Sequence, residues 1–220
     1  MIKYLGSKRT LIPALTQLGE ASGAKTALDL FTGTTRVAQA FKKLGMTVTA
    51  SDVASYSECF GKTWIELDGD NANRTELAEA ILELDDLKGE AGYFTEKFCV
   101  EARYFQPKNG EKVDAIRERI ERDYRESWMY YPLLTSLIMG ADRVDSTTGI
   151  QMAFLKGWAS RSANNLELRD PELLPGAGFS VRGDALEIAK DLPAVDLAYL
   201  DPPYNQHRYF SNYHIWESLV

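Results

Sequence analysis

The sequence predicts an α/β fold in which a parallel sheet is interrupted by a long, mainly helical lobe. Two apolar runs carry this prediction: residues 26–31, which precede a glycine turn and a helical pattern, and residues 195–200, which end at an aspartate. Buried parallel strands have such continuous apolar runs, and a strand followed by a turn and a helix is typical of a βαβ unit. The 172 residues from Asp29 to Asp201 are about double what a plain βαβαβ path needs. We therefore expect a sheet domain and an inserted lobe with these boundaries: residues 1–55 and 176–220 for the sheet, and residues 56–175 for the lobe.

The first strand leads into a segment that favours nucleotide binding. A tight turn at residues 32–35 and a helix at residues 36–44 follow the strand, and a second strand at residues 47–51 ends at Asp52. Asp52 lies 19 residues after Gly33, and an acidic residue about 20 positions after a glycine turn is where a ribose hydroxyl is held. A glycine turn alone is weak evidence, because many α/β proteins use glycine to turn from strand to helix. The pattern predicts a cofactor site at these positions: Asp29, Phe31, Gly33, Thr35 and Asp52.

Thr35 departs from the usual form of such a loop, because it stands where a second glycine is normally found. Its side chain should hold the backbone slightly further from a ligand than glycine would. We therefore expect weaker cofactor binding than a loop with two glycines gives.

The net charge of −7 is concentrated in one part of the lobe. Residues 66–90 hold nine acidic residues against two basic ones, which accounts for the whole formal charge. Leu77, Ile81 and Leu84 have helical spacing there, so the segment is interpreted as an acidic helix with one solvated face. The patterns in the rest of the lobe are also mostly helical, without repeats or a low-complexity linker.

Residues 97–125 have a different charge balance, with eight basic residues against six acidic ones and several aromatic residues among them. Basic residues interleaved with aromatics could contact phosphates and bases of a nucleic acid. Alternatively, Val113, Ile116 and Ile120 form a core-facing helical stripe, and the charged residues around it are i,i+4 pairs. The sequence leaves both interpretations open.

The run at residues 195–200 delivers the tetrapeptide Asp201-Pro202-Pro203-Tyr204 to the end of a strand, where open α/β sheets place ligands. This motif suits a site that methylates an exocyclic amine, a weak nucleophile whose lone pair is delocalised into a ring. The Asp201 carboxylate and the Pro202 carbonyl can accept its N–H groups, Pro203 helps to fix that carbonyl, and Tyr204 offers a ring for stacking. A sulfonium such as S-adenosylmethionine (SAM) is a methyl donor that needs only in-line positioning. The alternative is a Pro-Pro turn that ends a strand, with the aspartate as a cap.

A short strand at residues 179–182 precedes this motif and leaves Asp184 at its tip. Asp184 could accept a hydrogen bond from the adenine amine of SAM. It could also cap the helix at residues 185–190, and both roles can coexist.

The order of these motifs resembles that of the D12-type DNA adenine methyltransferases. In that family the SAM loop comes first, the recognition region follows, and the Asp-Pro-Pro-Tyr motif comes last. Residues 3–13 are similar to the family's opening motif, in which an aromatic residue and a lysine close over SAM; the resemblance assigns those roles to Tyr4 and Lys8. An aromatic face suits a sulfonium or an adenine, and a lysine can reach a carboxylate. The alternative is a flexible basic N-terminus.

Two further segments, residues 140–156 and 205–217, look like segments of one branch of that family. The resemblance implies that residues after the Asp-Pro-Pro-Tyr motif lie near a flipped base and the DNA backbone. The alternative is a polar loop followed by an ordinary helix, with His214 a hydrogen-bonded surface histidine. The candidate DNA-contacting residues are Arg143, Arg208, Tyr209, Asn212, Tyr213 and His214.

The resemblance implies a Rossmann-like SAM-dependent methyltransferase that acts on the N6 amine of adenine in double-stranded DNA, with the target base flipped out. It also implies a role in restriction-modification or epigenetic marking. Two alternatives remain: methylation of another exocyclic amine, such as cytosine N4 in DNA or a guanine amine in RNA, and a non-catalytic SAM- or DNA-binding module. The length and apolar content favour a cytoplasmic protein without a membrane span or signal peptide. Cys59 and Cys99 are too few and too isolated for a disulfide framework or a metal site, so we expect both to be reduced and buried.

The C-terminal end of the chain is shorter than such a sheet requires. A SAM-methyltransferase sheet is expected to continue for about three more strands after the catalytic one, and only residues 210–220 follow the motif's loop. We therefore expect the C-terminal strands to be missing or supplied by a partner. The uncovered sheet edge would favour self-association.

Overall fold

The computed structural model describes residues 2–4, 6, 8–203 and 209–220, and it contains two compact units that are treated separately. The sheet unit comprises Gly6–Ala72 and Glu172–His207. The helical unit comprises Met1–Leu5, Asn73–Pro171 and Arg208–Val220. Both ends of the chain thus group with the helices, whereas the sequence analysis assigned both ends to the sheet domain.

The sheet unit is built on four parallel strands in the order β3-β2-β1-β4. Leu28 of β1 pairs with Thr49 of β2 on one side and with Ala198 of β4 on the other. The central strands β1 and β2 are mostly buried, as the apolar run at residues 26–31 predicts. The burial predicted for residues 195–200 is wrong: β4 lies at the edge of the sheet, and its residues are half-buried or exposed. The parallel sheet confirms the α/β fold. The strands are β1 (Thr26–Asp29), β2 (Thr47–Asp52), β3 (Phe179–Arg182) and β4 (Leu197–Tyr199).

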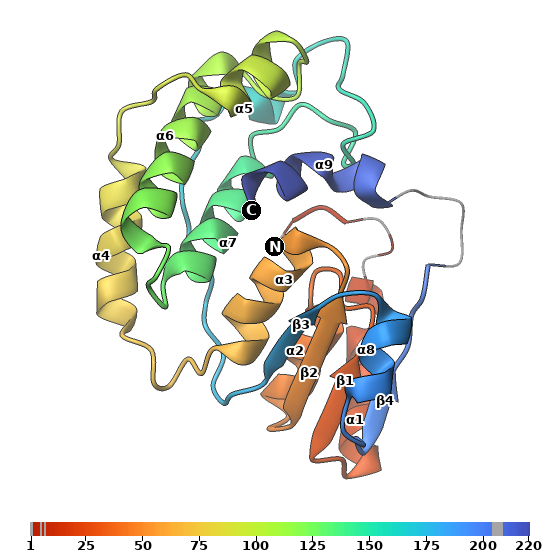
Figure 1. The fold of residues 1–220 in the computed structure, drawn as a ribbon. Helices are drawn as coiled ribbons and strands as arrows, with labels where there is room; N and C mark the ends of the chain where they lie inside the picture. Colours follow the sequence, from red (N-terminus) through yellow and green to blue (C-terminus); the bar gives the residue numbers. More distant parts are fainter. Residues whose placement is uncertain (1, 5, 7, 204–208) are drawn as a thin grey trace. The chain divides into compact units, whose positions relative to one another are not determined.

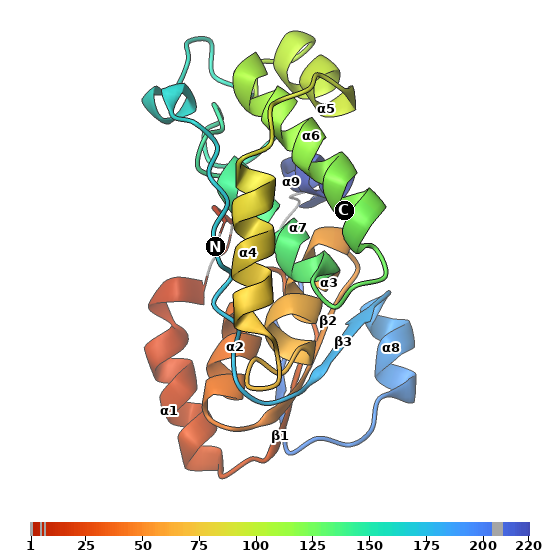
Figure 2. The same cartoon turned by 90° about the vertical axis from the view of Figure 1, so that its left-hand side faces the viewer.

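The connections between the strands run in two directions across the sheet. The chain moves from β1 through α2 to β2 and on to β3, and it then crosses back through α8 to β4. Right-handed crossovers in opposite directions place their helices on opposite faces, and Figure 2 shows α1 and α2 on one side of the strands and α8 on the other. The direction reverses between β1 and β4, which is where open α/β sheets bind ligands. The other elements of this unit are η1 (Lys8–Thr10), α1 (Ile12–Ser22), α2 (Arg36–Lys43), α3 (Ser55–Gly61), the π-helical turn η2 (Lys62–Glu66) and α8 (Ala185–Asp191).

Lys42, near the end of α2, is a buried structural lysine. Its Nζ donates hydrogen bonds to the carbonyls of Trp64, Ile65 and Leu67 at 3.0, 2.9 and 2.8 Å, around the end of η2. A helix end leaves such carbonyls without intrahelical partners, and the ammonium satisfies them. Burial lowers the pKa of Lys42 to about 8.

The helical unit packs around α7 (Tyr130–Ala141), in which every residue except Tyr131 is buried. Such a helix is apolar on all sides, which explains the continuous run in the sequence. In α6 the predicted stripe is confirmed, because Val113, Ile116 and Ile120 are fully buried. The other elements are α4 (Arg74–Asp85), α5 (Tyr93–Thr95), the π-helical turn η3 (Glu96–Val100), α6 (Pro107–Tyr124), η4 (Ser160–Ala163) and α9 (Tyr209–Leu219), shown in Figure 1.

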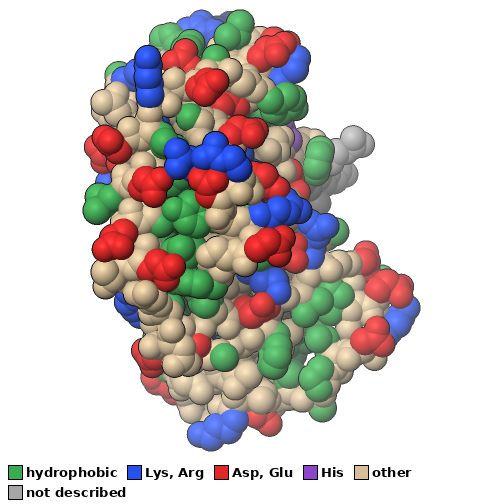
Figure 3. All heavy atoms as spheres, turned by 60° about the vertical axis from the view of Figure 1, so that its left-hand side comes forward, with side chains coloured by type: hydrophobic (Ala, Val, Ile, Leu, Met, Phe, Trp, Pro, Cys, Tyr) green, Lys and Arg blue, Asp and Glu red, His purple; other side chains and the backbone are tan. Residues whose placement is uncertain are grey.

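The basic residues of α6 are mainly paired with acidic residues of the same segment. Arg117 pairs with Glu121 at 2.9 Å, and Arg119 pairs with Asp123 at 3.3 Å. Arg125 also pairs with Glu121. On the face that Figure 3 shows, Lys and Arg side chains are interspersed with Asp and Glu side chains. The i,i+4 pairs are therefore confirmed for α6, and nucleic-acid contact by residues 97–125 stays a prediction.

Cys59 and Cys99 are both buried and free, as expected. Within residues 2–4, 6, 8–203 and 209–220, no group of three His, Cys, Asp or Glu side chains is arranged to hold a metal ion. In the same part of the chain, every helix is too short or too polar to cross a membrane.

Candidate functional site

Carboxylates gather at the carboxyl-terminal edge of the sheet. Asp29 ends β1, Asp52 ends β2, and Asp201 lies two residues after β4. Parallel strands bring these ends to one edge. Burial is the main cause of the raised pKa of Asp29, and the negative charges of Asp52 and Asp201 raise it further. The sequence-predicted acidic residues thus meet at the position where the crossover direction reverses.

Asp29 is the most deeply buried of these groups, with 1% of its surface exposed. Its Oδ2 accepts hydrogen bonds from Thr32 Oγ1 at 3.0 Å and from the Ala38 N–H at 3.1 Å. Its Oδ1 is buried and has no hydrogen-bond partner among the described residues. Burial raises the pKa of Asp29 from 3.8 to about 7, so the carboxyl is poised between neutral and charged near neutral pH. A cationic ligand nearby would favour its charged form.

The turn after β1 is fixed by Asp52. Asp52 Oδ2 accepts the Gly33 N–H at 2.8 Å, and Oδ1 accepts the Ala54 N–H at 3.1 Å. Gly33 has a φ of 51°, which glycine adopts without penalty. The acidic residue that the spacing picked out therefore shapes the glycine turn, and ribose binding by Asp52 stays a prediction.

Thr35 closes this turn in an unusual conformation for a β-branched residue. It is fully buried, with a φ of 60° and a ψ of 13°, in the left-handed region. Its hydroxyl donates to the Thr34 carbonyl at 2.7 Å and accepts from Gln39 Nε2 at 2.8 Å. Left-handed backbone costs a non-glycine residue about 1–2 kcal/mol, and such strain gathers at functional sites. Phe31, at the start of the turn, is half-buried.

Asp201 forms an ion pair with Lys8, with 2.5 Å between Nζ and Oδ2. Pro202 and Pro203 are exposed after it, and Tyr204 lies outside the described residues. Asp184 caps α8, because its carboxylate accepts the Leu186 N–H at 2.8 Å. The capping role of Asp184 is thus confirmed, and its cofactor role stays a prediction.

The predicted DNA-contacting residues of α9 lie in the helical unit, where Tyr213 interrupts the helix with a φ of −138°. The Tyr213 ring stacks on Tyr4, with 4.6 Å between the centroids and 16° between the planes. His214 packs against Phe98 and Tyr104, with centroids 5.9 and 5.7 Å away. Tyr4 therefore stacks within the helical unit, whereas Lys8, four residues later, belongs to the sheet unit.

Of Arg143, Arg208 and Tyr209, which were also predicted to contact DNA, only Arg143 has a described side chain. Arg143 is exposed after α7. Tyr209 begins α9, but its side chain is outside the described residues, and so is the whole of Arg208. DNA contact by these residues stays a prediction.

Gln151 is a candidate that sequence reasoning missed. Its backbone N–H donates to the Asn212 carbonyl, and its Oε1 accepts the Ile215 N–H, both at 2.8 Å. Gln151 and Asn212 are each 2% exposed, and their side-chain nitrogens have no hydrogen-bond partner among the described residues. An unpaired buried donor costs about 1–3 kcal/mol, so a pair of them beside an interrupted helix marks this place as a candidate ligand contact.

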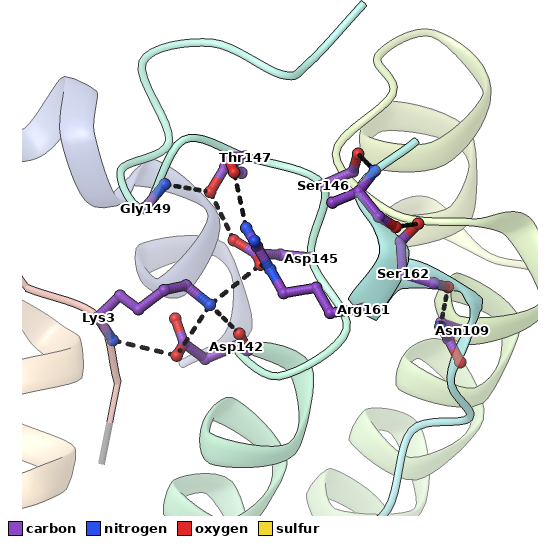
Figure 4. Close-up of polar contacts among 10 residues, drawn as sticks. Lys3, Asn109, Asp142, Asp145, Ser146, Thr147, Gly149, Arg161 and Ser162 are labelled. Atoms are coloured by element: carbon purple, nitrogen blue, oxygen red, sulfur yellow. Dashed lines mark hydrogen bonds and ion pairs between the residues drawn. The ribbon is translucent and has the colours of Figure 1, made fainter. Parts of the chain in front are cut away.

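An ion-pair network fixes the loop that follows α7, as Figure 4 shows. The buried Asp145 carboxylate pairs with Lys3 at 3.0 Å and with Arg161 Nε at 2.6 Å. Lys3 also pairs with Asp142 at 3.2 Å, and burial raises the pKa of Asp142 to about 6. Arg161 donates to the Thr147 carbonyl at 2.6 Å. Two aspartates three positions apart, directly after the apolar run of α7, were the available sequence signal for this network.

The loop held by this network carries basic and exposed aromatic side chains. Residues 146–166 contain no acidic residue. Phe154 and Trp158 are each 41% exposed, and Met152 is 61% exposed. The Arg103 guanidinium lies 4.7 Å from the centre of the Trp158 ring and donates to the Lys156 carbonyl at 2.9 Å. Exposed aromatic and basic groups without acids are the side chains that nucleic acids bind.

Comparison with known proteins assigns the chain to a family. A model of the D12 class N6 adenine-specific DNA methyltransferases matches residues 4–220. Modification methylase StsI of Streptococcus sanguinis is 33% identical over 243 residues, which cover 100% of this chain and 36% of StsI. Type II methyltransferase M.NlaIII of Neisseria lactamica is 33% identical over 235 residues, which cover 100% of this chain and 69% of M.NlaIII.

A more distant relative, type II methyltransferase M.FokI of Planomicrobium okeanokoites, is 28% identical over 240 residues, which cover 100% of this chain and 37% of M.FokI. No solved structure matches the chain significantly. The chain spans only part of each of these relatives, but the family model covers nearly all of it. The chain therefore belongs to the D12 class N6 adenine-specific DNA methyltransferase family.

Proposed function

We propose that this chain transfers a methyl group from SAM to the N6 amine of adenine in double-stranded DNA. The observation that carries the proposal is the position of Asp201: it follows β4 at the reversal point of the sheet, beside the acidic edge and the glycine turn. Family membership makes adenine the first substrate to test. The relatives are named as type II or modification methylases, so we also propose a role in DNA modification. Because the proposed substrate is DNA inside the cell, we also propose a cytoplasmic location.

The catalytic task is to make the lone pair of an aromatic amine available. Hydrogen-bond acceptors on its two N–H groups draw the nitrogen toward a tetrahedral geometry, in which the lone pair points out of the ring. Asp201 would accept one N–H and the Pro202 carbonyl the other, while the fixed φ of Pro202 and Pro203 limits how that carbonyl moves. Tyr204 would stack on the base and hold its plane.

The residues of the sheet edge fit a cationic cofactor that carries a nucleoside. When bound, SAM supplies an electrophilic methyl group on a sulfonium, which needs no metal. Phe31, Gly33 and Thr35 would line its binding loop. Asp52, and Asp184 beyond its capping role, would accept hydrogen bonds from its hydroxyl and amine groups. Among the residues that the structure describes, Oδ1 of Asp29 has no hydrogen-bond donor, and this favours the fit because a nearby positive charge stabilises such a buried carboxyl oxygen.

We infer that the helical unit supplies the DNA contacts. The acid-free loop at residues 146–166 presents Trp158 and Phe154 to solvent, and the ion pairs of Asp145 hold its base. A flipped base must be replaced or supported in the duplex, and aromatic side chains suit that role. We add to this surface the residues that the family resemblance implied: Arg143, Arg208, Tyr209, Asn212, Tyr213 and His214.

The test is a transfer assay with SAM labelled in its methyl group and duplex DNA of mixed sequence, followed by digestion and identification of the labelled nucleoside. Asp201→Asn keeps the size of the side chain but loses the charge and one acceptor, and Asp191→Asn makes the same change at an exposed position of α8. We expect label in N6-methyladenine with the wild type and with Asp191→Asn, and a loss on the order of 10²-fold or more with Asp201→Asn.

Other results would correct the proposal in defined ways. Label in N4-methylcytosine would change the substrate and keep the mechanism. Label in RNA but not in DNA would replace the partner. SAM binding without transfer to either nucleic acid would contradict the catalytic function and indicate a binding module.

A further inference from the structure

The ion pair between Lys8 and Asp201 joins two residues that are 193 positions apart in the sequence. Lys8 stands at the start of η1, directly after a turn in which Gly6 has a φ of 75°. Its Nζ lies 2.5 Å from Asp201 Oδ2 and donates to the Gly6 carbonyl at 3.2 Å. The ammonium is thus held by a backbone acceptor of its own turn as well as by the carboxylate.

The surroundings of this pair are otherwise acidic. The charge of Asp201 acts on Asp29 and on Tyr199, and in each case it raises the pKa, whereas Lys8 lowers the pKa of Tyr199. A carboxylate beside other acidic groups is repelled by them, and it keeps a fixed orientation only when a donor holds it. Lys8 supplies that donor from a side chain that is 18% exposed, and the Asp201 side chain is 30% exposed.

A carboxylate has two oxygens, and each can accept more than one hydrogen bond. Lys8 contacts Oδ2 of Asp201. An amine that donates to Oδ1 would therefore find the carboxylate already oriented. We propose that Lys8 is a positioning residue for the methyl-accepting amine: its ammonium holds one oxygen of the Asp201 carboxylate and leaves the other to accept an N–H of the target.

This inference rests on the proposed methyl transfer, and it differs from the role that the sequence resemblance gave to Lys8. A lysine that binds the cofactor acts on SAM affinity. A lysine that orients Asp201 acts on the transfer step once both substrates are bound. The two roles therefore separate in the measured constants, because a change confined to kcat reports an interaction made in the transition state.

The experiment is a double-mutant cycle that compares Lys8→Met, Asp201→Asn and the double variant. The matched control is Lys43→Met, which removes an exposed lysine at the end of α2. We expect Lys8→Met to lower kcat at saturating SAM and DNA roughly tenfold to a hundredfold, the loss that a misplaced catalytic group gives. The dissociation constant for SAM should change less than about twofold, and Lys8→Arg should recover part of the rate because it keeps the charge. In the Asp201→Asn background, Lys8→Met should have almost no further effect, since the two residues act as one unit.

Three outcomes would overturn the proposal. An unchanged or higher kcat in Lys8→Met would show that the ion pair blocks Asp201 in the resting protein. A weaker SAM affinity with a normal kcat would assign Lys8 to the cofactor. Fully additive losses in the double variant would show that Lys8 does not act through Asp201. Failure of the wild type to methylate any nucleic acid would instead reject the proposed function. The melting temperatures of Lys8→Met and Lys8→Arg show whether a loss of activity in these variants comes from misfolding.

Discussion

The substitution Asp29→Asn tests whether ionisation of the buried carboxyl at the end of β1 lowers the stability of the folded protein. The pKa of Asp29 is raised to about 7 in the folded protein and has its ordinary value of 3.8 in the unfolded chain. Between these values the folded state holds a proton that the unfolded state has released, so the free energy of unfolding falls as the pH rises. The slope is about 1.36 kcal/mol per pH unit for one proton. From about pH 5 to about pH 7 this amounts to roughly 2.7 kcal/mol, and the dependence ends above the folded pKa.

The amide that Asp29→Asn introduces cannot ionise, so this part of the pH dependence should disappear in the variant. The amide oxygen can keep the bonds from Thr32 and Ala38, but its NH2 group then takes the place of Oδ1, where no partner is described. That unpaired donor costs about 1–3 kcal/mol at every pH, so it cancels when two pH values are compared. We therefore expect the stability of Asp29→Asn relative to the wild type to increase by about 2–3 kcal/mol between pH 5 and pH 8.

The assay is urea unfolding of both proteins at about pH 5 and about pH 8, with the exposed Asp191→Asn as a control for the loss of one charge. The same relative stability at both pH values would refute the argument, because it would mean that Asp29 is already charged at the lower pH. A companion measurement is SAM affinity at pH 8, which should be weaker in Asp29→Asn if the charge is retained for a cationic ligand.

Three more perturbations follow from the structure. Thr35→Gly should relieve left-handed strain and bring the loop closer to its ligand, so calorimetry should show SAM binding that is a few-fold tighter; weaker binding would mean that the Thr35 hydroxyl contacts the ligand. Asp145→Ala should lower the free energy of unfolding by about 2 kcal/mol, less than for a fully buried pair because Lys3 and Arg161 are each 35% exposed; an unchanged urea midpoint would show that the network is dispensable. Trp158→Ala should weaken duplex DNA binding roughly tenfold in a titration and leave SAM affinity unchanged, whereas equal affinity for DNA would remove the loop from the interface.

The sheet unit was the more predictable part of this protein. Apolar runs, a glycine turn and helical spacing are local signals, and they identified β1, α2 and β2 with only small errors at the ends. The first strand was predicted to reach Phe31, but β1 ends at Asp29 and a turn begins at Leu30. The tetrapeptide at Asp201 was likewise readable, since the four residues carry their chemistry in adjacent positions.

The contacts that hold the candidate site were not predictable, because they join residues that are far apart. Lys3 meets Asp145 across 142 positions, and Lys8 meets Asp201 across 193. Lys42 was also not predictable, because a lysine in the last turn of a helix is normally solvated. Here it is buried, and its ammonium donates to backbone carbonyls. The backbone conformation of Thr35 was not predictable either, because β-branched residues avoid the left-handed region that it occupies.

The charge distribution gives a quantitative expectation for DNA binding. The net charge of −7 is accounted for by residues 66–90, and the candidate DNA loop at residues 146–166 has basic but no acidic residues. The cations of that loop are Lys156 and Arg161, and Arg103 is hydrogen-bonded to the loop at the Lys156 carbonyl. Arg161 is already paired with Asp145. Each phosphate neutralised contributes about −0.9 to the slope of log affinity against log salt, so two or three contacts predict a slope of about −2 to −3. A measured slope near about −6 would require basic residues outside this loop, and the DNA surface would then extend to parts of the chain that its local charge does not reveal.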